Sequence, residues 1–361
     1  MKADLRKKII GIISIVLVTA SILGGFAIAN RFYIPAEYEG TLANPLHESA
    51  SIPIGAAIAP HLLKTSTGYN TTASTHFNSF TAENVMKMGI IHPSENEYDW
   101  ESADYLVEYA ENHSIQIHGH CLVWHQQVPD WMENYQGTTQ DWKDMLKDHI
   151  QTVVTRYKDN ITSWDVVNEA VDGTGYRNTI WYENIGPDYI KLAFQWARDA
   201  DPNVKLYYND YSLCTNLDKL AFVTDMIENL ISEGVPVDGL GFQAHLTKHY
   251  ANYETIAAAM TYINELDIDI RVSELDISMN TEKLYHAYTD HLVQEQNNCY
   301  YDVVKGFSTA NRLTGITLWG IDDENSWIQY FRGLDWPLLF DGAFNPKPAA
   351  FSFQTALTQY L

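Results

Sequence analysis

The chain has 361 residues, of which 46 are acidic and 23 are Lys or Arg, so its formal net charge at pH 7 is −23. This charge repels phosphate backbones, and we therefore expect no nucleic-acid partner. The cysteines, Cys121, Cys214 and Cys299, show no C-x-x-C spacing, so the sequence predicts neither a zinc site nor a disulfide framework, and we expect no cofactor.

The N-terminus carries the features of an export signal. Four basic residues lie among the first eight positions, residues 9–30 are uncharged, and Ala27-Ile28-Ala29 fits a cleavage site. Residues 1–30 are therefore predicted to be a signal peptide, but residues 9–29 could also span a bilayer of about 30 Å as a retained membrane anchor or tether. In both cases we expect the remaining chain to be extracellular, secreted or held at the outer face of the cell membrane, with residues 31–50 as a short tether.

From residue 51 to residue 361, short β-rich runs alternate with longer segments whose apolar residues recur at helical spacing. This alternation predicts βα units and an α/β fold, and the absence of any linker predicts a single (β/α)8 TIM barrel over residues 51–361. The eight expected strands are Ile52–Ile58, His76–Phe80, Ile115–His120, Ser163–Asn168, Leu206–Asn209, Gly239–Ala244, Asp269–Ser273 and Ile316–Trp319. The clearest expected helices are Asp141–Tyr157, Pro187–Ala200, Leu217–Glu233 and Thr281–Ser308.

Unusual polar residues gather where these strands are expected to end, which is where such barrels place their active sites. They are Glu83, Asn84, His120, Asn168, Glu169, Asn209, Asp210, Gln243, His245, Glu274, Asp276 and, as an aromatic, Trp319. If all of these ends meet at one face of the barrel, the sequence predicts one polar site there.

Two glutamates are the strongest catalytic candidates. Glu169 and Glu274 lie 105 positions apart, about three βα units, which assigns them to strands four and seven. Glycoside hydrolysis needs a carboxylic acid that protonates the departing oxygen and a carboxylate at the anomeric carbon. Their environments must differ, and we expect donors such as Asn168 and His245 to keep one carboxylate ionised.

Two other features have plainer interpretations. His118, His120 and His125 could bind a metal, but no fixed-spacing zinc motif is present and sugar hydroxyls suit imidazole equally well, so we predict no metal site. The acidic run Asp322–Glu324 is expected to be a solvated loop.

Seven ordered motifs make the chain resemble the xylanases of glycoside hydrolase family 10 over residues 50–357. They are TAENVMK from Thr81, GHCLVWHQQVPDW from Gly119, WDVVNEA from Trp164, NDYS from Asn209, GFQAHL from Gly241, SELDIS from Ser273 and TLWGIDDENSW from Thr317. The resemblance implies a retaining endo-1,4-β-xylanase that acts on xylan and xylo-oligosaccharides, and we expect the chain to be a monomer.

The resemblance also implies roles for individual residues. Glu169 would be the acid/base and Glu274 the nucleophile, while His245, backed by Asp276, would hold the nucleophile ionised. Asn168 would contact the 2-hydroxyl beside the cut, and Tyr211 would line the leaving-group side. The expected glycone contacts are Glu83, Asn84, Lys87, His120, Trp124 and Gln243, with Trp319 and Trp327 as an aromatic wall.

Two alternatives remain at this stage. A related endo-β-1,4-glucanase would share the Asn168-Glu169 pair, although the motifs around His120 and Gln243 argue against it. A non-catalytic cell-surface polysaccharide-binding protein would keep the barrel without the chemistry, but both glutamates are present.

Overall fold

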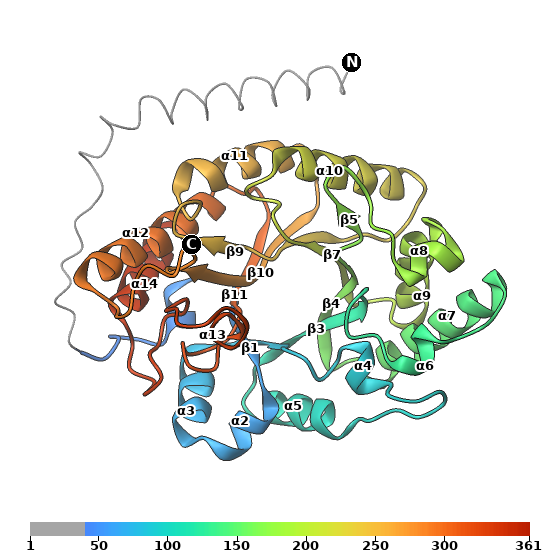
Figure 1. Ribbon diagram of the computed structural model, residues 1–361, viewed down its shortest axis with the longest axis horizontal. Coiled ribbons are helices and arrows are strands. Elements are labelled where there is room, and N and C mark those ends of the chain that lie inside the picture. Colours follow the sequence, from blue (N-terminus) through green and yellow to red (C-terminus); the bar gives the residue numbers. More distant parts are fainter. Residues whose placement is uncertain (1–39) are drawn as a thin grey trace.

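The computed structural model describes residues 40–361, and its centre is a closed barrel of eight parallel strands (Figure 1). Each strand pairs with the next along the chain, and the last strand pairs with both the seventh and the first, which closes the ring. The predicted (β/α)8 barrel is confirmed. Its strands are β1 (Ile54–Ile58), β2 (Ser79–Ala82), β3 (Gln116–Val123), β4 (Ile161–Asn168), β7 (Lys205–Asp210), β8 (Gly239–Phe242), β10 (Asp269–Ser278) and β11 (Leu313–Leu318).

Helices surround the barrel on its outside (Figure 1). The longer ones are α3 (Thr67–His76), α5 (Glu101–Asn112), α7 (Thr139–Arg156), α9 (Asp188–Ala200), α10 (Leu217–Ser232), α11 (Tyr253–Ile263), α12 (Asp290–Phe307) and α14 (Pro348–Tyr360). Short elements occupy the connections: the 3₁₀ helix η2 (Leu46–Ser49), α2 (Pro60–Thr65), α4 (Met88–Ile91), α6 (Asp130–Glu133), α8 (Ile180–Ile185), α13 (Trp327–Arg332), the hairpin β5 (Val171–Asp172) and β6 (Gly175–Tyr176), and β9 (His245–Thr247) beside β10.

Helix α7 illustrates how the sequence produces these elements. Thr138 and Asp141 form a capping box at its start, because each side chain accepts a hydrogen bond from the other residue's backbone N–H. Leu146, Ile150 and Val153 then recur at helical spacing and are fully buried. The capped start and the apolar stripe together fix where the helix begins and which face it turns to the barrel.

Two predicted elements were displaced. The second strand was predicted at 76–80, but α3 extends to His76, because the Phe77 N–H still bonds to the Ala73 carbonyl, and the strand begins only at Ser79. The helix predicted from Thr281 begins only at Asp290, because Thr289 caps it by accepting a hydrogen bond from the Leu292 N–H. Segment 281–288 is instead a loop.

The start of the described chain packs onto the barrel. Leu46 of η2 is fully buried, and the Gln354 side chain of α14 donates a hydrogen bond to the Asn44 carbonyl at 2.8 Å. The signal peptide predicted at 1–30, the possible anchor at 9–29 and the first part of the predicted tether lie outside the described residues. Across residues 40–361, none of the helices has both the length and the apolar character that a membrane crossing requires.

A buried pair of histidines connects α7 with the end of α4. The Nδ1 atoms of His92 and His149 lie 3.1 Å apart, and the two side chains are almost fully buried. Burial lowers the pKa of His92 to about 4 and that of His149 to about 3, the latter with a further contribution from the neighbouring His92. Both imidazoles are therefore neutral in the folded protein at neutral pH.

This pair predicts a loss of stability in acid. As pH falls below about 6.5, these histidines become protonated in the unfolded chain, whereas in the folded chain they stay neutral down to about pH 4. The free energy of unfolding therefore drops by up to about 1.4 kcal/mol per pH unit for each histidine. We expect His149→Gln to flatten this dependence between pH 6 and pH 4 in urea unfolding, whereas exposed His291→Gln should leave the slope unchanged. Equal slopes for His149→Gln and the original protein would contradict the prediction.

Candidate active site

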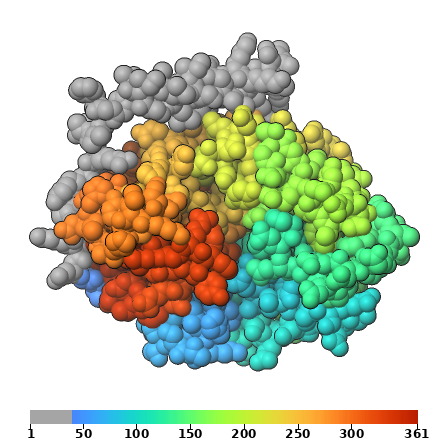
Figure 2. Space-filling view, in the orientation of Figure 1, coloured from blue at the N-terminus to red at the C-terminus, as the bar shows by residue number. Residues whose placement is uncertain are grey.

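A groove with a volume of about 990 Å³ opens at the carboxyl ends of the barrel strands, and Figure 2 shows this face hollowed between the red C-terminal segment and the yellow and green segments. We call it the main groove. Thirteen residues predicted for the site line it, and Asp276 lies behind His245. The thirteen are Glu83, Asn84, Lys87, His120, Trp124, Asn168, Glu169, Tyr211, Gln243, His245, Glu274, Trp319 and Trp327.

Glu169 turns the chain out of β4 into the main groove. Its φ angle is 57°, a left-handed conformation that costs energy for a residue with a side chain. Two hydrogen bonds hold this turn, because the Glu169 N–H donates to the Asn209 carbonyl at 2.9 Å and Arg177 Nε donates to the Glu169 carbonyl at 3.0 Å. Gln243 Nε2 donates to the carboxylate at 2.9 Å, which directs it across the groove.

Glu274 lies within β10 and is buried, with only 4% of its surface exposed. Asn209 Nδ2 donates to one carboxylate oxygen at 2.7 Å, and His245 Nε2 lies 3.1 Å from the other. Burial alone would raise the pKa of Glu274, but the hydrogen bond from His245 and the nearby charge of His120 outweigh it, so the pKa lies below its usual value. Glu274 is thus held as a carboxylate in a nearly dry position.

His245 is the cation that makes this possible. Burial would lower its pKa, but the two carboxylates beside it, first Asp276 and then Glu274, raise the pKa to about 10. Its Nδ1 lies 2.9 Å from Asp276, which is fully buried and also accepts a hydrogen bond from Trp327 Nε1 at 2.7 Å. Asp276 therefore fixes both the imidazolium and the Trp327 ring.

Asn168 connects the two glutamates. Its amide oxygen accepts hydrogen bonds from Asn209 Nδ2 at 3.0 Å and from Gln243 Nε2 at 3.2 Å. Each donor is itself fixed by a glutamate carboxylate, and this sets the orientation of the Asn168 amide. Gly241 leaves the room that Asn209 needs, because a Cβ there would lie 2.3 Å from the Asn209 Oδ1 atom.

Lys87 supplies a buried positive charge to the wall of the main groove. Its Nζ atom donates to Asn84 Oδ1 at 2.9 Å and lies 5.0 Å from the centre of the Trp124 ring and 5.8 Å from that of Trp319. Burial raises the pKa of neighbouring Glu83, although Lys87 opposes that rise. This wall therefore combines aromatic faces with hydrogen-bonding groups, as ligands rich in hydroxyls require.

The histidines considered for a metal have another partner. His118 Nε2 and His120 Nδ1 contact the two oxygens of buried Asp165 at 3.0 and 2.9 Å. Burial would raise the pKa of Asp165, but the two imidazoles lower it well below its usual range. Within residues 40–361, no cluster of three or more His, Cys, Asp or Glu side chains has the arrangement of a metal site.

The chemistry of the groove is that of a glycoside hydrolase. One carboxylate is kept ionised by fixed donors, a second carboxyl group faces the same space, and aromatic walls flank both. The model of glycosyl hydrolase family 10 matches residues 42–356. The chain belongs to this family. The resemblance inferred from the sequence motifs is confirmed.

Named relatives in family 10 cover most of the chain. Endo-1,4-beta-xylanase B of Thermotoga neapolitana is 36% identical over 320 residues, which are 88% of this chain and 91% of the relative. Xylanase 10B of Thermotoga petrophila in complex with xylobiose matches with a TM-score of 0.81 at 36% identity, covering 89% of this chain and 99% of that one. A variant of xylanase 10C of Cellvibrio japonicus in complex with xylopentaose matches with a TM-score of 0.84 at 35% identity, covering 88% and 70%.

Several residues in or beside the main groove were not predicted as site residues. Asn209 was noted as a strand end and as the first residue of the NDYS motif but was given no role, yet it donates directly to Glu274. Arg177 follows the hairpin after Glu169 and also donates to the Tyr211 hydroxyl at 2.6 Å, a pairing that no spacing in the sequence indicates. Tyr330 and Phe331 of α13 are exposed at the rim of the main groove. The sequence feature that could have indicated them is that the two aromatic residues are adjacent.

The prediction of a solvated acidic loop was wrong for two of its three members. Asp322 and Asp323 are buried, and Asp323 forms a buried ion pair with Lys347 at 2.9 Å. The reason is that Lys347 lies 24 positions later in the chain and approaches only through the fold. Glu324 alone is exposed, at the edge of the main groove.

Proposed function

We propose that this chain is a retaining endo-1,4-β-xylanase that cuts internal β-1,4-xylosidic bonds of xylan. The observation that carries the proposal is that Glu169 and Glu274 face one groove while only Glu274 is held by a partly buried cation, His245. The xylanase names of the family relatives and the xylobiose and xylopentaose in two of the similar structures support the choice of substrate.

Glu274 would act as the nucleophile and Glu169 as the acid/base. In the first step, a Glu274 carboxylate oxygen bonds to the anomeric carbon while the bond to the departing sugar oxygen breaks and that oxygen takes the Glu169 proton. In the second step, a water gives its proton to Glu169 and attacks the same carbon, and Glu274 leaves as a carboxylate. Two inversions give overall retention of configuration.

The other residues of the groove would bind the sugar chain. Asn168 would contact the 2-hydroxyl at the cut, Asp276 would support His245, and Tyr211 would line the leaving-group side. The aromatic wall would be Trp319 and Trp327, and the glycone contacts would be Glu83, Asn84, Lys87, His120, Trp124 and Gln243.

The substrate proposal is tested by comparing the release of reducing ends from xylan and from carboxymethylcellulose. We expect a clear preference for xylan, with chains shortened internally rather than from one end. A preference for carboxymethylcellulose would replace the xylanase by the related endo-glucanase. Tight binding of xylan without any hydrolysis would indicate a polysaccharide-binding protein instead.

Arg177 is expected to position the acid/base. It holds the carbonyl of Glu169, whose backbone is left-handed, and also contacts Tyr211. Loss of these hydrogen bonds in Arg177→Lys should lower kcat on xylan about tenfold, equivalent to roughly 1.4 kcal/mol, but should affect aryl xylosides with a good leaving group much less, since those need little protonation. Steady-state kinetics on both substrates check this, with Arg156→Lys, which alters a partly exposed ion pair to Asp104, as control. Equal losses on both substrates would show a merely structural role.

We further propose that the enzyme acts outside the cell as a monomer, either secreted or tethered by residues 9–29. The basic start and the uncharged stretch at the N-terminus support export, and a polymeric substrate requires it. Fractionation of cells that express the full chain should place activity in the medium or on membranes, and light scattering should give the mass of one chain. Activity confined to the cytosol would contradict this location.

A further inference from the structure

Two cationic side chains hold Tyr211 from behind. Tyr211 lies directly after β7 and lines the main groove. The Lys219 Nζ atom lies 3.4 Å from the centre of the Tyr211 ring, and Arg177 Nη2 donates to the Tyr211 hydroxyl at 2.6 Å. Neither Lys219 nor Arg177 is among the residues that line the groove. A buried ammonium group therefore covers one face of the ring, and the ring itself borders the space where a sugar would lie.

Lys219 is buried although it carries a charge. It belongs to the first turn of α10, where its N–H donates to the capping side chain of Asn216 at 3.0 Å, and only 2% of its surface is exposed. A buried cation is costly, and the partial positive charge at the start of a helix repels it further. The ion pair with Asp210, in which Lys219 Nζ donates to Oδ1 at 2.7 Å, offsets these costs. This ion pair sets the position of the ammonium group against the Tyr211 ring.

Asp210 fixes the same turn through its two carboxylate oxygens. It is fully buried and accepts hydrogen bonds from the Tyr208 hydroxyl at 2.5 Å and from the Tyr211 N–H at 2.8 Å. Burial raises the pKa of Asp210 to about 6, and Lys219 is the strongest influence that opposes this rise. Asp210 therefore holds the backbone of Tyr211, whereas Lys219 holds its ring and also keeps Asp210 ionised. An experiment has to separate these two effects of Lys219.

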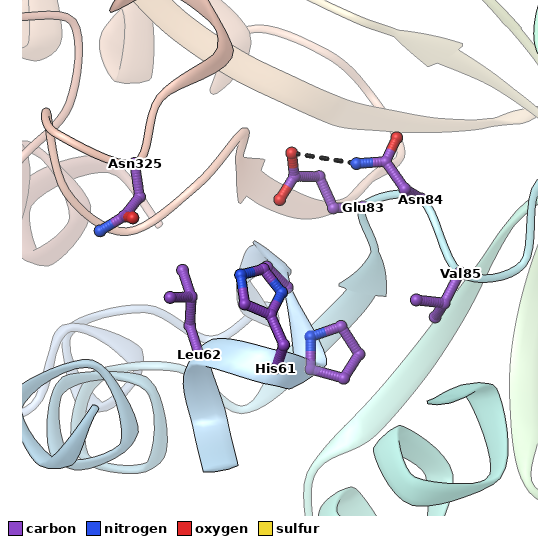
Figure 3. A pocket seen from close by; sticks show the side chains of 8 residues that line it. His61, Leu62, Glu83, Asn84, Val85 and Asn325 are labelled. Carbon is purple, nitrogen blue, oxygen red and sulfur yellow. Dashed lines mark hydrogen bonds between the residues drawn. The ribbon is translucent and has the colours of Figure 1, made fainter. Parts of the chain in front are cut away.

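The wall that would bind the glycone is organised differently. There the side chains that border the groove hold one another: Asn84 Nδ2 donates to Glu83 at 3.3 Å, as Figure 3 shows, and Lys87 Nζ donates to Asn84 at 2.9 Å. All three line the main groove, so each could also bond to a sugar hydroxyl. Lys219 does not border the groove, so it can act on the substrate only through the residues it contacts.

We propose that Lys219 is a positioning residue for the leaving-group side of the main groove. It fixes the Tyr211 ring as a platform for the sugar unit that departs in the first step and for a sugar acceptor that replaces water in the second. This inference rests on the proposed xylanase function. A sugar packs its apolar face against an aromatic ring, and a ring that is already immobilised loses little conformational freedom when the sugar binds. The buried ammonium group immobilises the ring by cation–π attraction, which is strongest where water is excluded.

Lys219→Met tests this role, because it removes the charge and keeps a side chain of similar length. Linear xylo-oligosaccharides place a sugar on the leaving-group side, whereas β-xylobiosyl fluoride has no ring there. We expect kcat/KM of Lys219→Met to fall about tenfold on the oligosaccharides and to stay within about twofold on the fluoride. Lys305→Met is the matched control and should change neither value, since it removes a lysine on α12 whose Nζ lies 4.5 Å from the centre of the Tyr253 ring on α11.

A double variant separates the effect on the ring from the effect on the ion pair. Asp210→Asn combined with Lys219→Met removes both buried charges, so no uncompensated carboxylate is left to disturb folding. If Lys219 acts on the Tyr211 ring, the double variant will keep the tenfold loss on the oligosaccharides. Full recovery of kcat/KM in the double variant would show that Lys219 only neutralises Asp210, and it would overturn the proposal.

The second step gives an independent readout. With β-xylobiosyl fluoride as donor, a hydroxyl of added xylobiose gives its proton to Glu169 and bonds to the anomeric carbon, while Glu274 leaves as a carboxylate. The xylobiose concentration at which half of the product is transfer product should rise about tenfold in Lys219→Met and in the double variant. An unchanged concentration would overturn the proposal, as would equal losses of kcat/KM on the oligosaccharides and the fluoride. Failure of the unaltered enzyme to release fluoride would instead refute the proposed function itself.

Discussion

Glu274→Ala will abolish hydrolysis of both xylan and aryl β-xylosides, with a fall in kcat on the order of 10⁵-fold. Without this carboxylate the anomeric carbon has no nucleophile in the position from which the covalent intermediate forms. Glu169→Ala will lose about 10²- to 10⁴-fold on xylan, because the departing sugar oxygen then lacks its proton donor. Its first step on aryl xylosides with a good leaving group will remain fast, and release of an initial burst of phenol measures that step.

Azide distinguishes the two roles by stereochemistry. In Glu274→Ala, azide enters the space left by the carboxylate, attacks the β-linked substrate from the opposite face and gives an α-glycosyl azide. In Glu169→Ala, it attacks the α-linked glycosyl-enzyme and gives a β-glycosyl azide. NMR of the products identifies each anomer, and exposed Glu282→Ala should behave as the original enzyme. The opposite pairing of variants and anomers would exchange the assigned roles, and normal turnover by Glu274→Ala would end the mechanism.

The barrel could be predicted from the sequence because each of its strands and helices produces a recognisable pattern over a short stretch of residues. Each barrel strand is a short β-rich run beside a helical segment, and polar residues such as Asn168 and Glu169 stand out where a strand ends. The spacing between Glu169 and Glu274 placed them on strands four and seven, as the strand order shows. A ring of parallel strands then brings these ends to one face without further information.

What the sequence could not predict depends on contacts between distant segments. Arg177 reaches Tyr211 and Asp323 reaches Lys347 only after the chain has folded. For that reason Arg177 was not predicted for the site at all, and Asp323 was predicted to be a solvated charge. The start of α12 is a local feature that periodicity does not show, because it is set by the capping side chain of Thr289 and not by the apolar residues before it. Periodicity alone is therefore weakest at element boundaries and at buried charges.

His245→Asn will move the acid limb of kcat/KM to higher pH. In the folded enzyme, burial pushes the pKa of Glu274 up and the hydrogen bond from His245 pulls it down. Once the imidazolium is gone, burial prevails and the pKa rises, so a larger fraction of Glu274 is protonated and unable to attack at mildly acidic pH. We expect the acid limb to shift by about one pH unit. The lost hydrogen bond between His245 and the Glu274 carboxylate should separately lower kcat/KM about 10²-fold near pH 6, equivalent to roughly 2–3 kcal/mol.

The same substitution also affects stability, but at alkaline rather than acid pH. Because the folded pKa of His245 is about 10, above the value of about 6.5 in the unfolded chain, its stabilising contribution is complete below pH 6.5 and is lost as pH rises toward 10. Urea unfolding of His245→Asn should therefore lack part of the decline seen in the original enzyme over that range. His249→Asn, which removes an exposed histidine paired with Glu282, is the matched control and should alter neither the acid limb nor the alkaline slope. If His245→Asn kept the original acid limb, the imidazolium would not be what holds Glu274 ionised, and the buried Asn209 donor would have to carry that role alone.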